Sequence, residues 1–190
     1  MRYPLFLDLV GQKVVVIGAG QVAERKVRLL LAAEADITVI SPQATAHIRK
    51  LARLKRVRWL RRRYRIGDLR TARLAIAATN DGTLNERICT DAKRRRLLVN
   101  CVAPPEAGNF IVPALVRCGN LTVAISTGGA SPALARRIRR ELEQYLHDGY
   151  AQAAVKMAAI RKAVSKDVKS AAKRRAIYRR SLKTWLKKAN

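Results

Sequence analysis

Short apolar runs alternate with amphipathic stretches along the first hundred residues of the chain. Most of these runs are built from Val, Ile, Leu and Ala without the regular polar and apolar alternation of a half-exposed strand. Continuous runs of this kind are typical of strands that are buried on both faces of a parallel sheet. We predict strands at residues 14–17, 37–40, 57–60, 74–78 and 97–100.

The stretches between these runs carry apolar residues at helical spacing. They predict helices over residues 21–34, 43–55 and 83–95, and Asp81 is placed to cap the third of them. Strands that alternate with helices form parallel sheets covered on both faces. The fold class predicted for this part is therefore α/β, a Rossmann-like doubly wound parallel sheet.

The alternation stops near residue 110. Two strand-like runs, 110–116 and 121–126, are separated only by the turn Arg117–Asn120, which predicts an antiparallel hairpin. Because no helix joins these runs, a second and smaller α+β unit is expected to begin here.

Helical patterns fill the rest of the chain. Ser131 and Pro132 provide an N-cap and a first helical residue for a helix that extends to about His147 and is broken by Gly149. Apolar residues at helical spacing continue to the C-terminus and predict a tail of two or more helices. The expected parts are a dinucleotide domain over 1–109, a small unit over 110–148 and a basic helical domain over 149–190.

The turn after the first strand carries the strongest motif. Gly18, Gly20 and Ala23 have the spacing G-x-G-x-x-A between a strand and a helix, which is the context of the dinucleotide-binding fingerprint. Gly18 permits a tight turn, and Gly20 lets a pyrophosphate approach the backbone because it has no Cβ. We expect Gly18, Gly20, Gln21 and Val22 to hold the pyrophosphate of NAD at the helix N-terminus. A strand-turn-helix without a ligand is the alternative.

Two further strand ends complete the expected nucleotide site. Ser41, Pro42 and Gln43 follow the second strand and are expected near the adenosine ribose, while Thr79 and Asn80 follow the fourth and are expected on the nicotinamide side. NAD fingerprints usually have Asp or Glu where this chain has Ser41. The choice between NAD and NADP is therefore open, since nearby arginines could tolerate an extra phosphate.

The composition is strongly basic. The chain of 190 residues has 40 Lys and Arg against 13 Asp and Glu, a formal net charge of +27. Such a field attracts polyanions, either nucleic acids or a small substrate with many carboxylates. The basic tail has no recognised reading motif, so no specific nucleic-acid binding is expected.

The cysteine content and the hydropathy indicate the cellular compartment in which the protein is expected. Cys89, Cys101 and Cys118 are odd in number and lack C-x-x-C spacing, so no disulfide framework and no metal site are predicted. No apolar stretch is long enough for a membrane span, and the N-terminus does not have the pattern of a signal peptide. We expect a cytoplasmic protein that does not bind membranes.

Several stretches, read together, resemble one family. They are 4–6 (PLF), 22–26 (VAERK), 74–79 (LAIAAT), 110–114 (FIVPA) and 131–136 (SPALAR). With the fingerprint, they are similar to the precorrin-2 dehydrogenase / sirohydrochlorin ferrochelatase family, which also forms the N-terminal part of bacterial sirohaem synthases. The resemblance covers residues 4 to about 145, and the tail matches only in being helical.

The resemblance implies a reaction and a substrate class. In the family, NAD⁺ takes a hydride from precorrin-2 and a proton is released to give sirohydrochlorin; some members then insert Fe²⁺ to make sirohaem. It also implies an intertwined homodimer in which the small unit dimerises. Both tetrapyrroles carry many carboxylates, which suits a cationic protein. Arg136, Arg137 and the arginines of 61–65 are candidates to bind them.

The same resemblance implies further site residues. Asn100, Val102 and Phe110 would line the crevice between the cofactor and the macrocycle. Thr127 keeps a hydroxyl at the family's Ser or Thr position beside a glycine turn and would shape the substrate pocket. A structural turn that only starts a helix is the alternative for this stretch.

The chain departs from the family at one important position. Bifunctional members have an aspartate in the loop after the fifth strand, credited with general-base work, and this chain has Ala103 there. Hydride transfer depends mainly on holding the reactive carbon against the nicotinamide, whereas chelation requires removal of two pyrrole protons. Ferrochelatase activity is therefore doubtful. Glu106 is the nearest carboxylate that could substitute, and His47 is another titratable candidate; exposed surface positions are the alternative for both.

Three functions remain open from the sequence. The first is an NAD-dependent precorrin-2 dehydrogenase without chelatase activity, and the second is a bifunctional enzyme in which Glu106 replaces the missing aspartate. The third is a non-catalytic nucleotide-binding protein that associates with polyanions.

Overall fold

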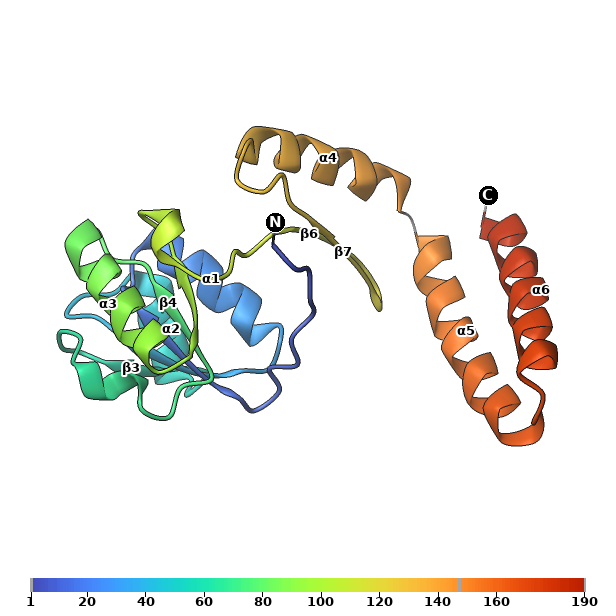
Figure 1. Cartoon of the computed structure of the whole chain (residues 1–190), viewed down its shortest axis with the longest axis horizontal. Helices are drawn as coiled ribbons and strands as arrows, with labels where there is room; N and C mark the ends of the chain where they lie inside the picture. The colour runs from blue at the N-terminus through green and yellow to red at the C-terminus, as the bar shows by residue number, and fades with distance from the viewer. Residues whose placement is uncertain (1, 147, 190) are drawn as a thin grey trace. The chain divides into compact units, whose positions relative to one another are not determined.

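A five-stranded parallel sheet forms the centre of the N-terminal part of the computed structural model, which describes residues 2–146 and 148–189 (Figure 1). All neighbouring strands are parallel, in the order β3-β2-β1-β4-β5. This confirms the predicted Rossmann-like sheet, and the strand order reverses between β1 and β4. The strands are β1 (Lys13–Ile17), β2 (Asp36–Ile40), β3 (Arg58–Leu60), β4 (Leu74–Ala77) and β5 (Leu98–Cys101).

The two faces of this sheet bury separate apolar clusters. On one face, Val14 and Val16 pack in one cluster with Ala23 and Val27 of α1 (Gln21–Leu31). The other face places the alternate strand residues, such as Val15 and Ile17, in a cluster with Ile88 and Ala92 of α3 (Gly82–Arg94). Because successive side chains of a strand point to opposite faces, burial of both faces requires the continuous apolar runs seen in the sequence.

Local hydrogen bonds set the helix boundaries. The helix predicted over 43–55 begins later, as α2 (Ala46–Arg53), because the Thr45 hydroxyl accepts a hydrogen bond from the Ile48 amide at 3.2 Å. Asp81 caps α3 as predicted, accepting from the Leu84 amide at 3.0 Å. Residues 32–34 leave the helix predicted over 21–34, since the chain turns there and Glu34 has a φ of 55°. Two short 3-10 helices, η1 (Ile66–Leu69) and η2 (Pro105–Ala107), lie in loops.

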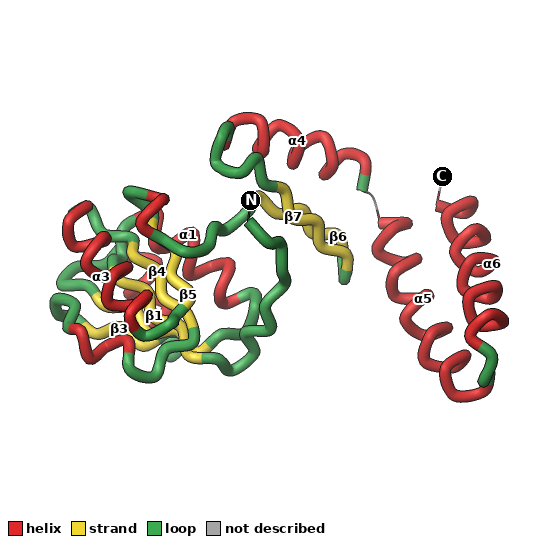
Figure 2. The backbone as a smooth tube through the Cα atoms, in the orientation of Figure 1, coloured by secondary structure: helices red, strands yellow, loops and turns green. Residues whose placement is uncertain are grey.

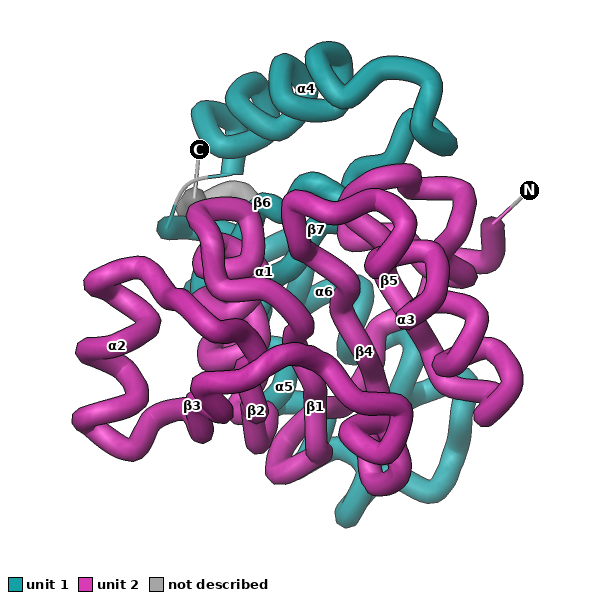
Figure 3. Tube along the Cα trace, turned by 90° about the vertical axis from the view of Figure 1, so that its left-hand side faces the viewer, with its two compact units in different colours: residues 1, 113–190 teal, residues 2–112 magenta. Residues whose placement is uncertain are grey.

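In chain order, residues 2–112 form the first compact unit, magenta in Figure 3, and residues 113–146 and 148–189 form the second, teal in Figure 3. The second unit begins with an antiparallel hairpin of β6 (Ala114–Cys118) and β7 (Leu121–Ile125). The hairpin was predicted, but its turn is the two residues 119–120 rather than four, and Gly119 has a φ of 55°. The predicted three-part division of the chain stays a prediction.

In the described part of the chain, helices complete the second unit (red in Figure 2). They are α4 (Pro132–Tyr145), α5 (Asp148–Asp167) and α6 (Ala171–Ala189). Ser131 caps α4 as predicted, accepting from the Leu134 amide at 3.2 Å. Gly149 does not break the preceding helix, because it lies inside the first turn of α5. The expected helix end at His147 falls outside the described residues.

Hydropathy adds one finding about membranes. Within residues 2–146 and 148–189, no helix combines the length and the apolar character that crossing a membrane would need.

Candidate nucleotide and substrate site

The turn between β1 and α1 lies at the carboxyl edge of the sheet, beside the point where the strand order reverses. Gly18 has a φ of 104°, and its amide donates to the Ile40 carbonyl at 2.9 Å. A Cβ on Gly18 would lie 2.2 Å from the Ala78 carbonyl oxygen, a distance that no side chain can adopt. The first glycine of the fingerprint is therefore required by the fold itself.

Gly20 occupies a different environment at the start of α1. It is the N-cap residue, with φ −80° and ψ −174°, and a Cβ there would meet no atom within 4 Å. No side chain among the described residues caps this helix, whereas α2, α3 and α4 are capped by Thr45, Asp81 and Ser131. The open space and the uncapped amides of α1 suit the pyrophosphate of a dinucleotide.

The residues expected near the adenosine ribose follow β2 and lie beside the end of β3. The Ser41 amide donates to the Leu60 carbonyl at 3.2 Å, and the Trp59 indole nitrogen donates to the Ser41 carbonyl at 3.0 Å. Ser41 is half-buried, and Pro42 and Gln43 are exposed. These two hydrogen bonds hold the ends of β2 and β3 together at the carboxyl edge.

Asn85 connects the loop after β4, expected on the nicotinamide side, to the loop after β5, expected beside the macrocycle. It is fully buried, and its Oδ1 accepts from the Thr79 amide at 3.0 Å and the Thr79 hydroxyl at 2.8 Å. Its Nδ2 donates to the carbonyls of Thr79 at 3.2 Å and Ala103 at 2.9 Å. One side chain of α3 thus holds the loops after β4 and β5 together, and Asn80 stands exposed in the first of them.

Sequence reasoning missed Asn85, although a signal was present. Asn85 shares one face of α3 with Ile88, Cys89 and Ala92, all buried, at helical spacing. An amide at a core-facing position of a helix has to find hydrogen-bond partners. Read in this way, the pattern would have indicated a polar link to neighbouring backbone.

Asn100 has a buried side-chain oxygen that no group among the described residues satisfies. Its side chain is 5% exposed, and its Nδ2 donates to the Phe110 carbonyl at 3.1 Å. Its Oδ1 is buried without a hydrogen-bond partner in the described part of the chain. Buried acceptors are normally satisfied, so this oxygen suits an N–H group of a bound ligand. The site residues present therefore fit a dinucleotide at two independent points, α1 and β5.

The loop after β5 holds the position where the family's aspartate is missing. Ala103 is exposed, and its carbonyl is bound by Asn85. Glu106 is exposed on η2 of the same loop, whereas Val102 and Phe110 are half-buried and pack against an apolar cluster. Ala103 and Glu106 thus lie three residues apart in the same loop. Glu106 is the one carboxylate that this loop could provide in place of the missing aspartate.

Asn109 was also missed from the sequence. Its Oδ1 accepts from the Val99 amide at 2.7 Å, and its Nδ2 donates to the Leu97 carbonyl at 2.8 Å. These bonds tie the end of the loop back to the edge strand β5. No spacing pattern in the sequence distinguishes this residue from an ordinary loop asparagine.

The remaining candidates lie in the second unit or on the surface. The Thr127 hydroxyl accepts from the Ser131 amide at 3.0 Å and donates to the Ser131 carbonyl at 3.1 Å, so it closes the turn before α4. Arg136 and Arg137 are exposed on α4, and Arg137 pairs with Glu141 at 2.9 Å. His47 is exposed on α2 of the first unit. Their roles toward a substrate stay predictions.

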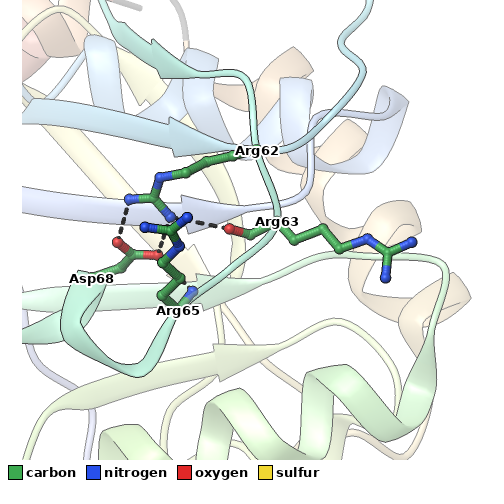
Figure 4. Close-up of polar contacts among 4 residues, drawn as sticks. All are labelled: Arg62, Arg63, Arg65 and Asp68. Carbon is green, nitrogen blue, oxygen red and sulfur yellow. Dashed lines mark hydrogen bonds and ion pairs between the residues drawn. The ribbon is translucent and has the colours of Figure 1, made fainter.

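The basic segment after β3 is organised by one carboxylate (Figure 4). Asp68 accepts two hydrogen bonds from the Arg62 guanidinium, at 2.9 and 2.6 Å, and one from the Arg65 amide at 2.8 Å. Burial opposes ionisation of Asp68, but these donors outweigh it and lower its pKa. Arg62 therefore has a structural role, while Arg61 and Arg63 remain exposed.

Tyr64, in the middle of this segment, anchors it to α3. Its hydroxyl lies 3.1 Å from the Asp91 carboxylate, and Asp91 is a buried acid. Burial, together with the nearby Asp91 charge, raises the pKa of Tyr64. The tyrosine therefore stays protonated and donates a hydrogen bond to Asp91.

Comparisons with known proteins agree with this geometry. Residues 5–114 match the family described as putative NAD(P)-binding, and residues 119–145 match the central domain of sirohaem biosynthesis proteins. A solved structure of SirC, precorrin-2 dehydrogenase, covers 98% of this chain and 98% of its own, with a TM-score of 0.81 and 28% identity. The chain belongs to the precorrin-2 dehydrogenase / sirohydrochlorin ferrochelatase family. This membership confirms the resemblance and supports NAD as the cofactor.

Longer relatives of the precorrin-2 dehydrogenase / sirohydrochlorin ferrochelatase family also match. The siroheme synthase of Chromobacterium violaceum is 41% identical over 152 residues, 80% of this chain and 32% of the synthase. The siroheme synthase of Neisseria meningitidis serogroup C is 35% identical over 176 residues, 93% of this chain and 37% of the synthase. The chain thus spans about a third of the length of these curated relatives.

Proposed function

We propose that the chain catalyses the NAD-dependent oxidation of precorrin-2 to sirohydrochlorin in sirohaem biosynthesis, in the cytoplasm. The observation that carries this proposal is the open N-terminus of α1, where Gly20 leaves free space and no described side chain caps the helix. The similarity to SirC over 98% of the chain supports the choice of substrate.

Each part of the site has a role in this reaction. When bound, NAD⁺ supplies the hydride acceptor. Gly18, Gly20, Gln21 and Val22 bind its pyrophosphate, and the Asn100 Oδ1 accepts a hydrogen bond from a ligand N–H. Asn85 fixes the loops that line the reacting carbon, which is the main requirement for hydride transfer. Arg136 and Arg137 pair with substrate carboxylates.

The proton released with the hydride needs no dedicated base at residue 103. Ala103 cannot accept a proton, so the proton goes to water or another base. Insertion of Fe²⁺ as a second substrate is a harder reaction for this site, because two pyrrole protons must leave. We therefore propose a dehydrogenase that does not accelerate metal insertion.

A bifunctional enzyme is the second candidate function. Glu106 favours it, because this carboxylate is exposed on η2, three residues beyond Ala103. Its substitution for the missing aspartate would require the η2 loop to present the carboxylate to the macrocycle.

An anaerobic assay separates these functions. Precorrin-2 and NAD⁺ are supplied, NADH and the sirohydrochlorin spectrum are followed, and Fe²⁺ or Co²⁺ is then added. We expect sirohydrochlorin without accelerated metal insertion, and we expect Ala103→Asp to gain insertion activity. Accelerated insertion by the unaltered chain that is lost in Glu106→Gln would instead establish the bifunctional enzyme. No NADH at all would favour a non-catalytic nucleotide-binding protein.

We also propose that the chain acts as a homodimer. Among the side chains described in the second unit, only Val116, Ala135 and Ala153 are buried apolar residues. Large apolar side chains there stay exposed, including Leu134 at 48% and Tyr145 at 64%. A unit with so small a core gains stability by burying these side chains against a second copy.

A further inference from the structure

The end of β2 lacks the carboxylate that selects against a 2′-phosphorylated nucleotide. In NAD-binding sheets an Asp or Glu at this position binds the ribose hydroxyls, and its charge repels a 2′-phosphate. Here β2 is followed by Ser41, Pro42 and Gln43. A hydroxyl in this place can bind either a ribose or a phosphate oxygen.

The neighbouring strand brings arginines to the same edge of the sheet. Ile40 of β2 pairs with Leu60 of β3, and the Ser41 amide donates to the Leu60 carbonyl at 3.2 Å. Arg61 follows Leu60 directly, so the register places it beside Ser41. Trp59 strengthens the pairing, because its indole nitrogen donates to the Ser41 carbonyl.

Asp68, the one acidic residue in the segment 61–70 after β3, already has its charge neutralised. Asp68 is bound by the Arg62 guanidinium and the Arg65 amide, and its side chain is only 9% exposed. Figure 4 shows the Arg63 side chain extending away from Asp68. Arg61 and Arg63 are both exposed. Arg61 lies beside Ser41 by the register, and Arg63 follows it by two residues.

We propose that the adenosine end of the nucleotide site binds a 2′-phosphate through Arg61 and Arg63, so that the chain takes NADP⁺ as well as NAD⁺. This inference rests on the proposed dinucleotide site at α1. The guanidinium groups form charge-assisted hydrogen bonds to the phosphate, and the Ser41 hydroxyl provides a neutral partner.

The direct test compares two probes that differ only in the 2′-phosphate. Binding of adenosine 2′,5′-bisphosphate and of 5′-AMP is measured by calorimetry on the full chain, with NADP⁺ and NAD⁺ as a second pair. We expect the 2′-phosphate to tighten binding about tenfold or more. Equal affinities within each pair would overturn the inference while leaving the proposed function intact. Failure of all four molecules to bind would overturn both.

Matched variants separate a local contact from general attraction to a basic protein. Arg61→Gln and Arg63→Gln are expected to remove most of the 2′-phosphate preference, with NAD⁺ affinity changed less than about threefold. Arg73→Gln is the control, because this exposed arginine precedes β4 at the opposite edge of the sheet. Equal loss of preference in all three variants, with native circular dichroism, would show a non-specific charge effect and contradict the inference.

Discussion

The two glycines of the fingerprint have different physical requirements, although the motif treats them alike. Gly18 is required by a positive φ and by the Ala78 carbonyl, whereas the space beside Gly20 is open to solvent. The first position is therefore required by the fold, and the second is the one that we propose to serve the ligand.

Substitution of Gly20 tests this distinction. We expect Gly20→Asp to keep the free energy of unfolding within about 1 kcal/mol of the unaltered chain, because Asp is a good N-cap residue. The added carboxylate should weaken NAD binding by about 100-fold or more, since it repels the pyrophosphate. Denaturant unfolding and calorimetry measure the two effects. Gly18→Ala is the matched control, and we expect it to lose about 2 kcal/mol or more in the free energy of unfolding. Unchanged NAD affinity in Gly20→Asp would show that NAD does not bind at this turn.

The ion pair of Arg62 and Asp68 makes stability depend on pH in a defined direction. The pKa of Asp68 is lowered in the folded chain, so its ionised form stabilises the fold above the ordinary carboxylate pKa of about 4. That contribution is lost as the pH falls through the lowered value. We expect Arg62→Ala to cost roughly 1–3 kcal/mol near pH 7, and less as the pH drops below about 4. A cost that does not change with pH, measured by denaturant unfolding, would contradict this account.

At the scale of elements, the strands and helices that follow from runs of apolar residues or from a capping residue can be predicted from the sequence. The strands of the sheet are found because burial of both faces demands apolar runs such as Val14–Ile17, and α3 is found because Asp81 caps it. The start of α2 and the hairpin turn were misplaced, because single hydrogen bonds and one left-handed glycine decide them. The nucleotide site was expected at strand ends and its residues stay a prediction. Asn85, which links two of the loops there, was missed because its hydrogen bonds join α3 to the loops after β4 and β5.

Asn85 gives a prediction at this scale. Asn85→Leu keeps a similar volume but removes the hydrogen bonds that join the loops after β4 and β5. We expect a loss of roughly 2–3 kcal/mol in the free energy of unfolding, because buried polar groups lose their partners. Dehydrogenase activity should fall as well, since these are the loops that we propose to line the reacting carbon. Glu86→Leu, at the next and exposed position of α3, is the control. If the two variants had the same free energy of unfolding, the hydrogen bonds of Asn85 would contribute little to stability.

At the scale of the whole molecule, the two compact units differ in how they bury apolar surface. The first unit has a core on both faces of its sheet, whereas the described side chains of the second include three buried apolar residues. Composition alone gave no sign of this difference, because apolar residues are frequent in both parts.

Association of two copies is the expected consequence. Sedimentation equilibrium should give twice the mass of the chain, and the melting temperature should rise with protein concentration. Charged substitution of an exposed apolar residue of the second unit, as in Leu134→Glu, should weaken the dimer. A monomer at all concentrations would contradict the proposal.

The ratio of the two products decides whether the chain is a precorrin-2 dehydrogenase. Under anaerobic conditions, NADH and sirohydrochlorin are quantified in the same reaction of the full chain with precorrin-2 and NAD⁺. The proposed dehydrogenase forms one molecule of each per molecule of precorrin-2, because one hydride and one proton leave the substrate. Sirohydrochlorin no faster than in the absence of protein, with no NADH, would contradict the claim.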